Sequence, residues 1–260
     1  MQYLWQLPAI LVTVLVVGVP FLTWLGVLGP DAFRWGFVPG VALGVVSTIV
    51  LGAAGALAAA SGRVWRRQVV RAGMIPLFLT IVVLVLANRG AGVPAIHDIS
   101  TDPSAPLEIR PEVLALTQAG RTEVPQEQLA EIQREAYPDV VPLVVAAQPN
   151  QVFERALQTA RVMENWEVTE ASVKERRIEA EVTSRVFRFV DDVVIQVRKE
   201  PRGSRVDVRS RSRMGVSDLG ENAARIRVYL GDLSGRFMAP KLLPFEADPA
   251  AATSSEQGAP

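Results

Sequence analysis

The chain opens with three apolar stretches and continues with shorter segments in which apolar and polar residues alternate. The stretches cover residues 7–28, 37–60 and 72–88, and none of them contains a charged side chain. At about 1.5 Å per helical residue, they can cross or nearly cross a hydrocarbon core about 30 Å thick. No Lys or Arg precedes the first stretch, which predicts a retained span rather than a signal peptide. We therefore predict a membrane region over residues 1–92 with three transmembrane helices embedded in the lipid bilayer.

The orientation of this region follows from its short loops, because Lys and Arg accumulate on the cytoplasmic side. The loop between the second and third stretches holds Arg63, Arg66, Arg67 and Arg71, whereas the other loop holds Arg34 alone. The N-terminus is thus predicted to be cytoplasmic in a multi-pass protein of the bacterial inner membrane. The C-terminal domain is predicted to be extracytoplasmic, which means periplasmic in a Gram-negative cell. Reporter fusions after residue 95 should be active outside the cytoplasm, and activity only inside it would contradict this topology.

Small residues recur at every fourth position of the second stretch, which predicts a face for close helix packing in lipid. They are Gly40, Gly44, Thr48, Gly52 and Ala56. The face can pack against the two neighbouring spans, or it can contact another membrane protein or a second copy of the chain. No ionisable residue lies well inside any stretch, which argues against a pump or an ion-coupled transporter.

A composition change marks the end of the membrane region. Residues 93–137 contain several Pro among polar residues and predict an extended linker with a short helix at Gln126–Ala136. Residues 238–260 are rich in Ala, Pro, Ser and Glu and predict a disordered tail. Between them, residues 138–237 are numerous enough to bury a core of their own, so we predict a separate domain there.

Within this domain the pattern predicts a strand, a helix, four strands and a final helix. The first helix follows Pro149 and the second begins at Asp218, and each has one apolar face. Short connections predict antiparallel neighbours. The predicted fold is therefore α+β, with an antiparallel sheet of about five strands packed by two helices. The predicted strands are Val140–Ala147, Trp166–Ala171, Arg177–Phe187, Asp192–Lys199 and Ser204–Met214.

Composition and charge sharpen this division. Residues 1–96 hold six Arg and one Asp, whereas residues 97–260 hold 21 basic and 26 acidic residues, so the formal net charge of zero is a cancellation. The absence of Cys excludes a disulfide scaffold, a thiolate nucleophile and a Cys-ligated metal. A single His remains for imidazole chemistry. No Walker loop, dinucleotide-binding fingerprint, nucleophile elbow or zinc-protease motif occurs, so no cofactor and no metal are expected.

The most unusual run is RVDVRSRSRMGVS, which begins at Arg205. On a strand it places a stripe of charged residues on one face: Arg205, Asp207, Arg209, Arg211 and Arg213. One interpretation is cross-strand pairing with Glu179 and Glu181 on a solvated sheet face. The other is an anion site, because guanidinium groups bind phosphate and carboxylate and a helix that starts at Asp218 and includes Asn222 offers backbone donors. Nucleic acid is not expected, because the domain is net acidic and no aromatic residues alternate with the Arg residues.

Two further groups could carry chemistry. His97 with Asp98 and Asp102 could form a base with an orienting carboxylate or hold a metal, although local turn capping explains the Asp residues equally well. Asp191 and Asp192 could form a carboxylate dyad, or simply a turn. None of these groups forms a complete catalytic constellation in the sequence.

Four runs of the chain resemble a bacterial and plastid family catalogued as domain of unknown function 1499. They are AIHDISTDPSAP from Ala95, YPDVVPL from Tyr137, FRFVDDVVIQV from Phe187 and GSRVDVRSRSRMGVSDLGENAARI from Gly203. The resemblance covers about residues 95–235 and is most specific in the last run. It implies that the charged stripe, the HDISTD run and the paired Asp residues belong to the family's own pattern. It implies no activity and no catalytic residues.

Three functional hypotheses follow. The first is a non-enzymatic, membrane-anchored module that binds a partner protein or an anionic ligand through Arg209, Arg211, Arg213, Asp218 and Asn222. The second is a module that binds a lipid or a small apolar ligand between the sheet and its helices. The third is a hydrolase that uses His97 or the Asp191 and Asp192 pair.

Overall fold

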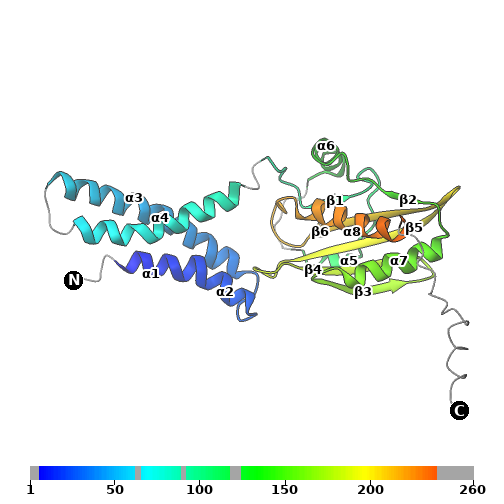
Figure 1. Cartoon of the computed structure of the whole chain (residues 1–260), viewed down its shortest axis with the longest axis horizontal. Helices are drawn as coiled ribbons and strands as arrows, with labels where there is room; N and C mark the ends of the chain where they lie inside the picture. The colour runs from blue at the N-terminus through cyan, green and yellow to red at the C-terminus, as the bar shows by residue number, and fades with distance from the viewer. Residues whose placement is uncertain (1–5, 62–65, 89–91, 118–123, 239–260) are drawn as a thin grey trace, which may run out of the picture.

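The structure, a computed structural model, describes residues 6–61, 66–88, 92–117 and 124–238. It consists of a group of long helices and an α+β domain that lies beyond one end of them (Figure 1). The domain is formed by the chain that follows the helices. The predicted disordered tail lies outside the described residues, apart from its first residue.

Three helical rods form the N-terminal part. The first contains α1 (Leu7–Thr13), the π-helical turn η2 (Val14–Gly18) and α2 (Val19–Trp24); the second contains the π-helical turn η3 (Phe33–Phe37) and α3 (Val38–Ala60); the third is α4 (Arg66–Asn88). Each π turn lies just before a proline, Pro20 or Pro39. The proline ring clashes with the carbonyl four residues earlier in a regular α-helix, and the wider π turn relieves that clash.

Two of the rods, Leu7–Trp24 and Phe33–Ala60, are long and apolar enough to cross a membrane. The third predicted span, residues 72–88, lies in α4, whose apolar stretch Val69–Val85 is shorter. α4 packs along α3 over much of its length (Figure 1). Two N-terminal apolar helices are consistent with membrane association, and a third span stays a prediction.

The small residues of α3 do not form a single packing face within the chain. Gly40 lies against Leu15 and Gly44 against Thr80, where an added Cβ would be 2.5 Å and 3.0 Å from the nearest atom. Thr48 is half-buried, whereas Gly52 and Ala56 are exposed. A step of four residues turns a helix by about 400°, so a four-residue stripe drifts by about 40° per step. The packing prediction is therefore wrong for Gly52 and Ala56 within the chain, and their contact with another membrane protein stays a prediction.

Six antiparallel strands form one sheet in the order β1-β6-β5-β4-β3, with β2 paired to β6 on the same side as β1. The predicted α+β class is confirmed, and the sheet has one strand, β1, that the alternation pattern does not predict. The strands are β1 (Asp98–Ser100), β2 (Leu143–Val145), β3 (Trp166–Ser172), β4 (Arg177–Thr183), β5 (Val190–Glu200) and β6 (Gly203–Ser212).

One face of the sheet packs against α7 (Pro149–Val162) and α8 (Glu221–Met238) to form the hydrophobic core. Ile178, Ile195 and Val208 are buried in this core from three neighbouring strands. The Tyr229 ring of α8 stacks on Trp166 with centroids 5.4 Å apart, and its hydroxyl donates to the carbonyl oxygen of Ala156 at 3.0 Å. Burial of the Tyr229 side chain raises its pKa above the usual range.

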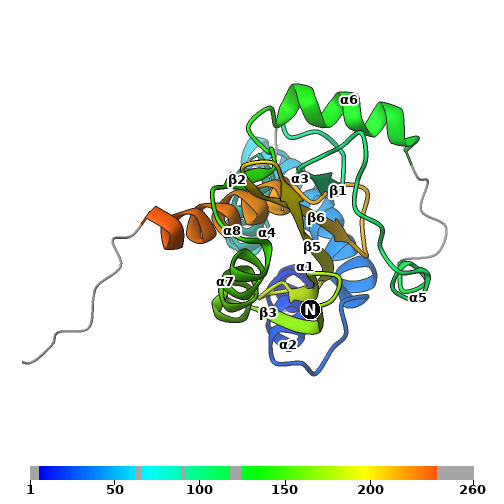
Figure 2. The ribbon, with the colours of Figure 1, turned by 90° about the vertical axis from the view of Figure 1, so that its right-hand side faces the viewer.

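The opposite face of the sheet is also covered. Residues 101–113, which we call the covering segment, cross this face and end in the short helix α5 (Pro111–Leu114). Figure 2 shows the sheet between this side of the domain and the layer of α7 and α8. Leu107 and Ile109 are buried against Val194 of β5. This part of the predicted linker therefore contributes a second, smaller hydrophobic cluster to the folded domain.

The helix α6 (Gln126–Ala136) forms where the sequence predicts it and packs beside β1. The buried Gln133 side chain accepts from the Ser100 N–H at 3.0 Å and donates to the Ser100 carbonyl oxygen at 2.5 Å. Its amide therefore bonds to the outer edge of β1 as a neighbouring strand would, and the edge is closed against further pairing.

Candidate functional site

The predicted alternation of β6 is observed, and it brings Arg209, Arg211 and Arg213 to the face beneath the covering segment. In the sheet, Arg211 lies between two carboxylate residues on the neighbouring strands, Asp98 of β1 and Asp192 of β5. We call these five side chains the charged layer. Each of them is 7–13% exposed, so the layer is nearly dry.

Asp98 is the centre of one half of the charged layer. Its two carboxylate oxygens accept from Arg209 Nε at 2.9 Å and from Arg209 Nη2 at 2.6 Å, which is a bidentate pair. Arg211 Nη1 lies 3.6 Å from the same carboxylate. The remaining end of Arg209 donates to the carbonyl oxygen of Leu107 at 2.5 Å, so the covering segment completes its hydrogen bonding.

Asp192 is the centre of the other half. It accepts from Arg213 Nη2 at 2.6 Å and from Arg213 Nε at 3.0 Å, and Glu181 of β4 also accepts from Arg213. These hydrogen bonds raise the pKa of Arg213 above its usual range. Glu179, the other predicted partner, pairs instead with Arg110 and Arg177 at 2.8 Å each.

The charged layer therefore differs from both interpretations of the stripe. Cross-strand pairing is present, but the face is buried rather than solvated because residues 101–113 cover it. The anion-site interpretation requires guanidinium groups that a ligand can reach, whereas Arg209 and Arg213 hold carboxylates of the chain itself. These residues act chemically as an internal ion-pair network that fastens the covering segment to the sheet.

A second polar cluster lies on the other face of the same strands, beneath the start of α8. The fully buried Asn222 accepts from Ser210 Oγ at 2.7 Å and donates to Ser212 Oγ and to the His97 carbonyl oxygen at 3.0 Å each. Arg225 donates to Asp191 at 2.6 Å and to Ser210 at 2.8 Å. This cluster satisfies its own polar groups and fixes α8 to the ends of β5 and β6.

Asp218 caps the N-terminus of α8. Its carboxylate accepts from the backbone N–H groups of Gly220 at 2.8 Å and Asn222 at 2.9 Å, as a capping residue does. Burial raises the pKa of Asp218 against the effect of these two hydrogen bonds. The predicted site residues Asp218 and Asn222 thus belong to the cluster under α8 and not to the Arg face.

The structure separates the predicted carboxylate dyad. Asp191 points to the α8 side and pairs with Arg225, whereas Asp192 points to the covered side and pairs with Arg213. Two successive residues of a strand project to opposite faces, so they cannot share a proton. His97 is buried next to β6, where its carbonyl oxygen accepts from Ser212 N–H at 2.9 Å. Among the described residues, no group of three His, Asp or Glu side chains could hold a metal ion.

A family profile described as protein of unknown function (DUF1499) matches residues 98–233, which is just over half of the chain. The chain belongs to this family. The DUF1499 match begins at the first residue of β1 and ends within α8, so it includes the covering segment together with the whole sheet. Searches of curated proteins and of solved structures found no match to the chain.

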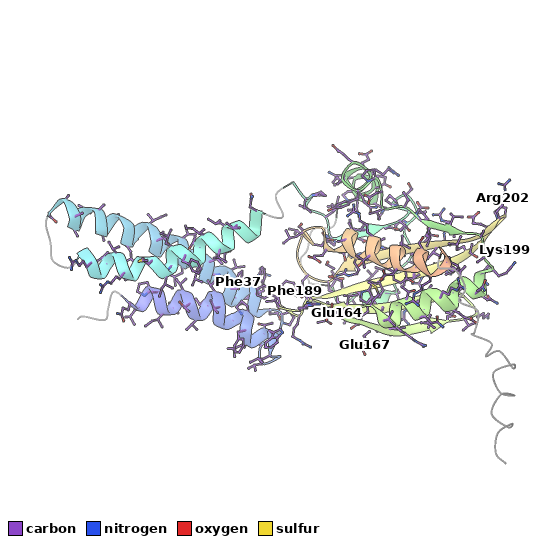
Figure 3. The ribbon with its side chains drawn as sticks, in the orientation of Figure 1. Phe37, Glu164, Glu167, Phe189, Lys199 and Arg202 are labelled. Carbon is purple, nitrogen blue, oxygen red and sulfur yellow. The ribbon has the colours of Figure 1, made fainter. Side chains whose placement is uncertain are left out.

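The DUF1499 domain contacts the N-terminal helices through aromatic side chains. Phe187 and Phe189 follow β4 in the loop to β5, and Phe33 and Phe37 form part of η3. The centroid of the Phe33 ring is 4.7 Å from that of Phe187 and 5.3 Å from that of Phe189. The ring centroids of Phe37 and Phe187 are 5.1 Å apart. Figure 3 shows Phe37 and Phe189 close together where the two parts meet. We call these four side chains the aromatic junction.

A cavity of about 250 Å³ lies at this junction. It is lined by Trp24 at the end of α2 and by polar residues of the domain: Asn165, Thr183, Ser184, Arg185 and Arg188. Sequence reasoning did not identify these residues. Thr183, Ser184 and Arg185 fall inside the predicted strand Arg177–Phe187, and the other lining residues lie outside it. The run Ser184–Phe189 places two Arg residues and two Phe residues within six positions, which is the signal that could have indicated a surface site.

Proposed function

We propose that this protein is a non-enzymatic module of the bacterial inner membrane, with three spans and an extracytoplasmic domain. Two apolar helices support the anchoring. The direction of α4 supports three spans, because it runs beside α3 and ends on the domain side (Figure 1). Arg67 and Arg71 lie at the start of α4, at the opposite end from the domain. The domain and the Arg-rich loop then occupy opposite sides of the membrane, as the charge rule requires.

The domain binds an anionic ligand at the membrane surface, and the junction cavity is the observation that carries this proposal. Its lining contains two guanidinium groups, an amide and two hydroxyl groups, all of which can donate hydrogen bonds to an anion. The proposed contact is therefore at Arg185 and Arg188 and not at the buried Arg209, Arg211 and Arg213.

The alternatives find less support in the geometry. An apolar ligand between the sheet and its helices would need space that Ile195, Val208 and Tyr229 fill in the packed core. A hydrolase based on the paired carboxylates would need Asp191 and Asp192 on one face, whereas each is paired with a different Arg on a different face.

The test is purification of the full chain in a mild detergent, followed by native mass spectrometry and identification of bound molecules. We expect an anionic molecule at a fixed ratio to the chain, retained after exchange into a second detergent. A bound partner protein with no anionic molecule would show that the domain recognises a protein and not an anionic ligand. A chain that repeatedly emerges alone and free of small molecules would contradict the proposal.

A further inference from the structure

The junction cavity combines residues from three separate places in the fold. Trp24 is the last residue of α2, at the end of the first rod. Asn165 lies in the turn between α7 and β3, and Arg185 and Arg188 lie in the loop between β4 and β5. Figure 3 labels Glu164, the neighbour of Asn165, on the domain side of this junction. The cavity therefore exists only where the domain meets its membrane helices.

The two Arg residues of the cavity are not equivalent. Arg185 forms an ion pair with Glu164, so its charge is balanced within the chain. Arg188 is exposed and forms no ion pair with any residue in the described part of the chain. Its positive charge is therefore available to a ligand in the cavity.

The backbone of Arg188 adds an independent observation. Its φ of 53° lies in the left-handed region, which costs a non-glycine residue energy and is more easily adopted by Gly, Asn or Asp. Two hydrogen bonds between Ser184 and Phe189 hold the loop in this form. The Phe189 N–H donates to Ser184 Oγ at 2.8 Å, and the Phe189 carbonyl oxygen accepts from the Ser184 N–H at 2.8 Å. Because Ser184 Oγ accepts there, its own hydroxyl hydrogen can still be donated. The loop thus presents Arg188 at an unfavourable backbone position beside an available hydroxyl donor.

Depth in the bilayer favours a lipid over a solute. The first rod, Leu7–Trp24, has 18 residues, which is a length of about 27 Å, close to the thickness of the hydrocarbon core. Trp24 at its end is 56% exposed, and such rings prefer the membrane–water interface. The volume of about 250 Å³ is below the range of about 300–1,000 Å³ for small-molecule pockets. It suits part of a ligand whose remainder lies in the bilayer.

We propose that the junction cavity binds the phosphate-bearing headgroup of an anionic phospholipid, with Arg188 as its principal contact. Thr183, Ser184 and Asn165 would donate further hydrogen bonds, and the acyl chains would follow the surface of the first rod below Trp24. This inference rests on the proposed function, because it names the ligand class of the same cavity. A guanidinium fork fits a phosphate group in a bidentate geometry.

The test compares lipid binding by the full chain and three variants in the same detergent, measured by native mass spectrometry with added phosphatidylglycerol or phosphatidylcholine. Arg188→Asn removes the charge but tolerates the left-handed backbone, and Arg188→Lys keeps the charge. Arg202→Asn is the matched control, because Arg202 is an exposed residue of another strand connection at the far end of the sheet (Figure 3). A cooperative unfolding transition of each variant, measured in that detergent, verifies that its domain is folded.

We expect Arg188→Asn to weaken phosphatidylglycerol binding about tenfold, which corresponds to about 1.4 kcal/mol. Arg188→Lys should stay within about threefold of the native chain, and Arg202→Asn should match it. Equal binding of phosphatidylglycerol by Arg188→Asn and the native chain would overturn the inference. So would displacement of the lipid by inorganic phosphate at equal concentration, since the cavity would then recognise a free anion. If another anionic molecule copurifies independently of Arg188, the inference fails while the proposed function stands.

Discussion

Replacing Asp98 with alanine is expected to lower the free energy of unfolding of the domain by about 3–5 kcal/mol. The Asp98 carboxylate is 7% exposed and holds the 12% exposed Arg209 in a bidentate pair, with Arg211 nearby. Its removal leaves the Arg209 guanidinium in a nearly dry layer without the carboxylate that holds it. An uncompensated buried charge costs far more than the net value of the intact pair. Because Asp98 also lies in β1, the loss should loosen the covering segment first.

The matched control is Asp139→Ala. Asp139 holds Arg227 in the same bidentate geometry, at 2.5 Å and 2.7 Å, but it is 57% exposed and its partner is 40% exposed. Solvent screens such a pair, so the expected loss is at most about 1 kcal/mol. Both losses are measured by urea unfolding of the full chain in mild detergent, with far-ultraviolet circular dichroism as the probe. Equal losses for the two variants would show that burial does not govern these pairs.

Replacing Gly203 with alanine is expected to lower the free energy of unfolding of the domain by about 3 kcal/mol or more and to detach β2 from the sheet. The φ of Gly203 is 146°, a region that is essentially confined to glycine. An added Cβ would lie 2.1 Å from the carbonyl oxygen of Val145 and 2.9 Å from the Cα of Ala146. Backbone strain and overpacking each cost about 1–3 kcal/mol, and here the clashing atoms are backbone atoms that cannot rotate away.

Gly231→Ala provides the opposite expectation. Gly231 lies within α8, is exposed, and has no atom within 4 Å of an added Cβ. Alanine should therefore stabilise the helix by up to about 1 kcal/mol. Unfolding midpoints of both variants, with hydrogen exchange of the β2 amides, distinguish the two effects. A tolerated alanine at position 203 would mean that β2 does not lie against the β5 to β6 turn.

Local periodicity accounts for much of what the sequence predicts correctly. In β6 each Arg alternates with a small or apolar residue, and a strand must send these two sets to opposite faces. The same rule makes Asp191 and Asp192 diverge in β5. The predicted strand begins at Asp192 and leaves Asp191 in a turn, so the sequence does not exclude a carboxylate dyad. The two main helices of the domain likewise follow from their apolar faces and from the residues that begin them.

Contacts between distant segments account for what the sequence did not reveal. β1 has only three residues, Asp98–Ser100, which is too short for alternation to identify a strand. The covering segment reads as a Pro-rich linker because its polar carbonyl groups find their donors, Arg177 and Arg209, some 69 and 102 residues later. The junction cavity requires Trp24 and Arg188 to meet, and no local pattern records such a meeting.

The sequence by itself determined the apolar rods, the α+β class and the grouping of the Arg residues on one face of a strand, because each depends on the spacing of neighbouring residues. Only the tertiary structure decided whether that face is free or occupied. It is occupied, because residues about one hundred positions earlier in the chain fill it: β1 supplies Asp98 and the covering segment supplies the Leu107 carbonyl group. The affinity of an Arg for a ligand depends on whether another carboxylate already neutralises it, and that is a property of the folded chain.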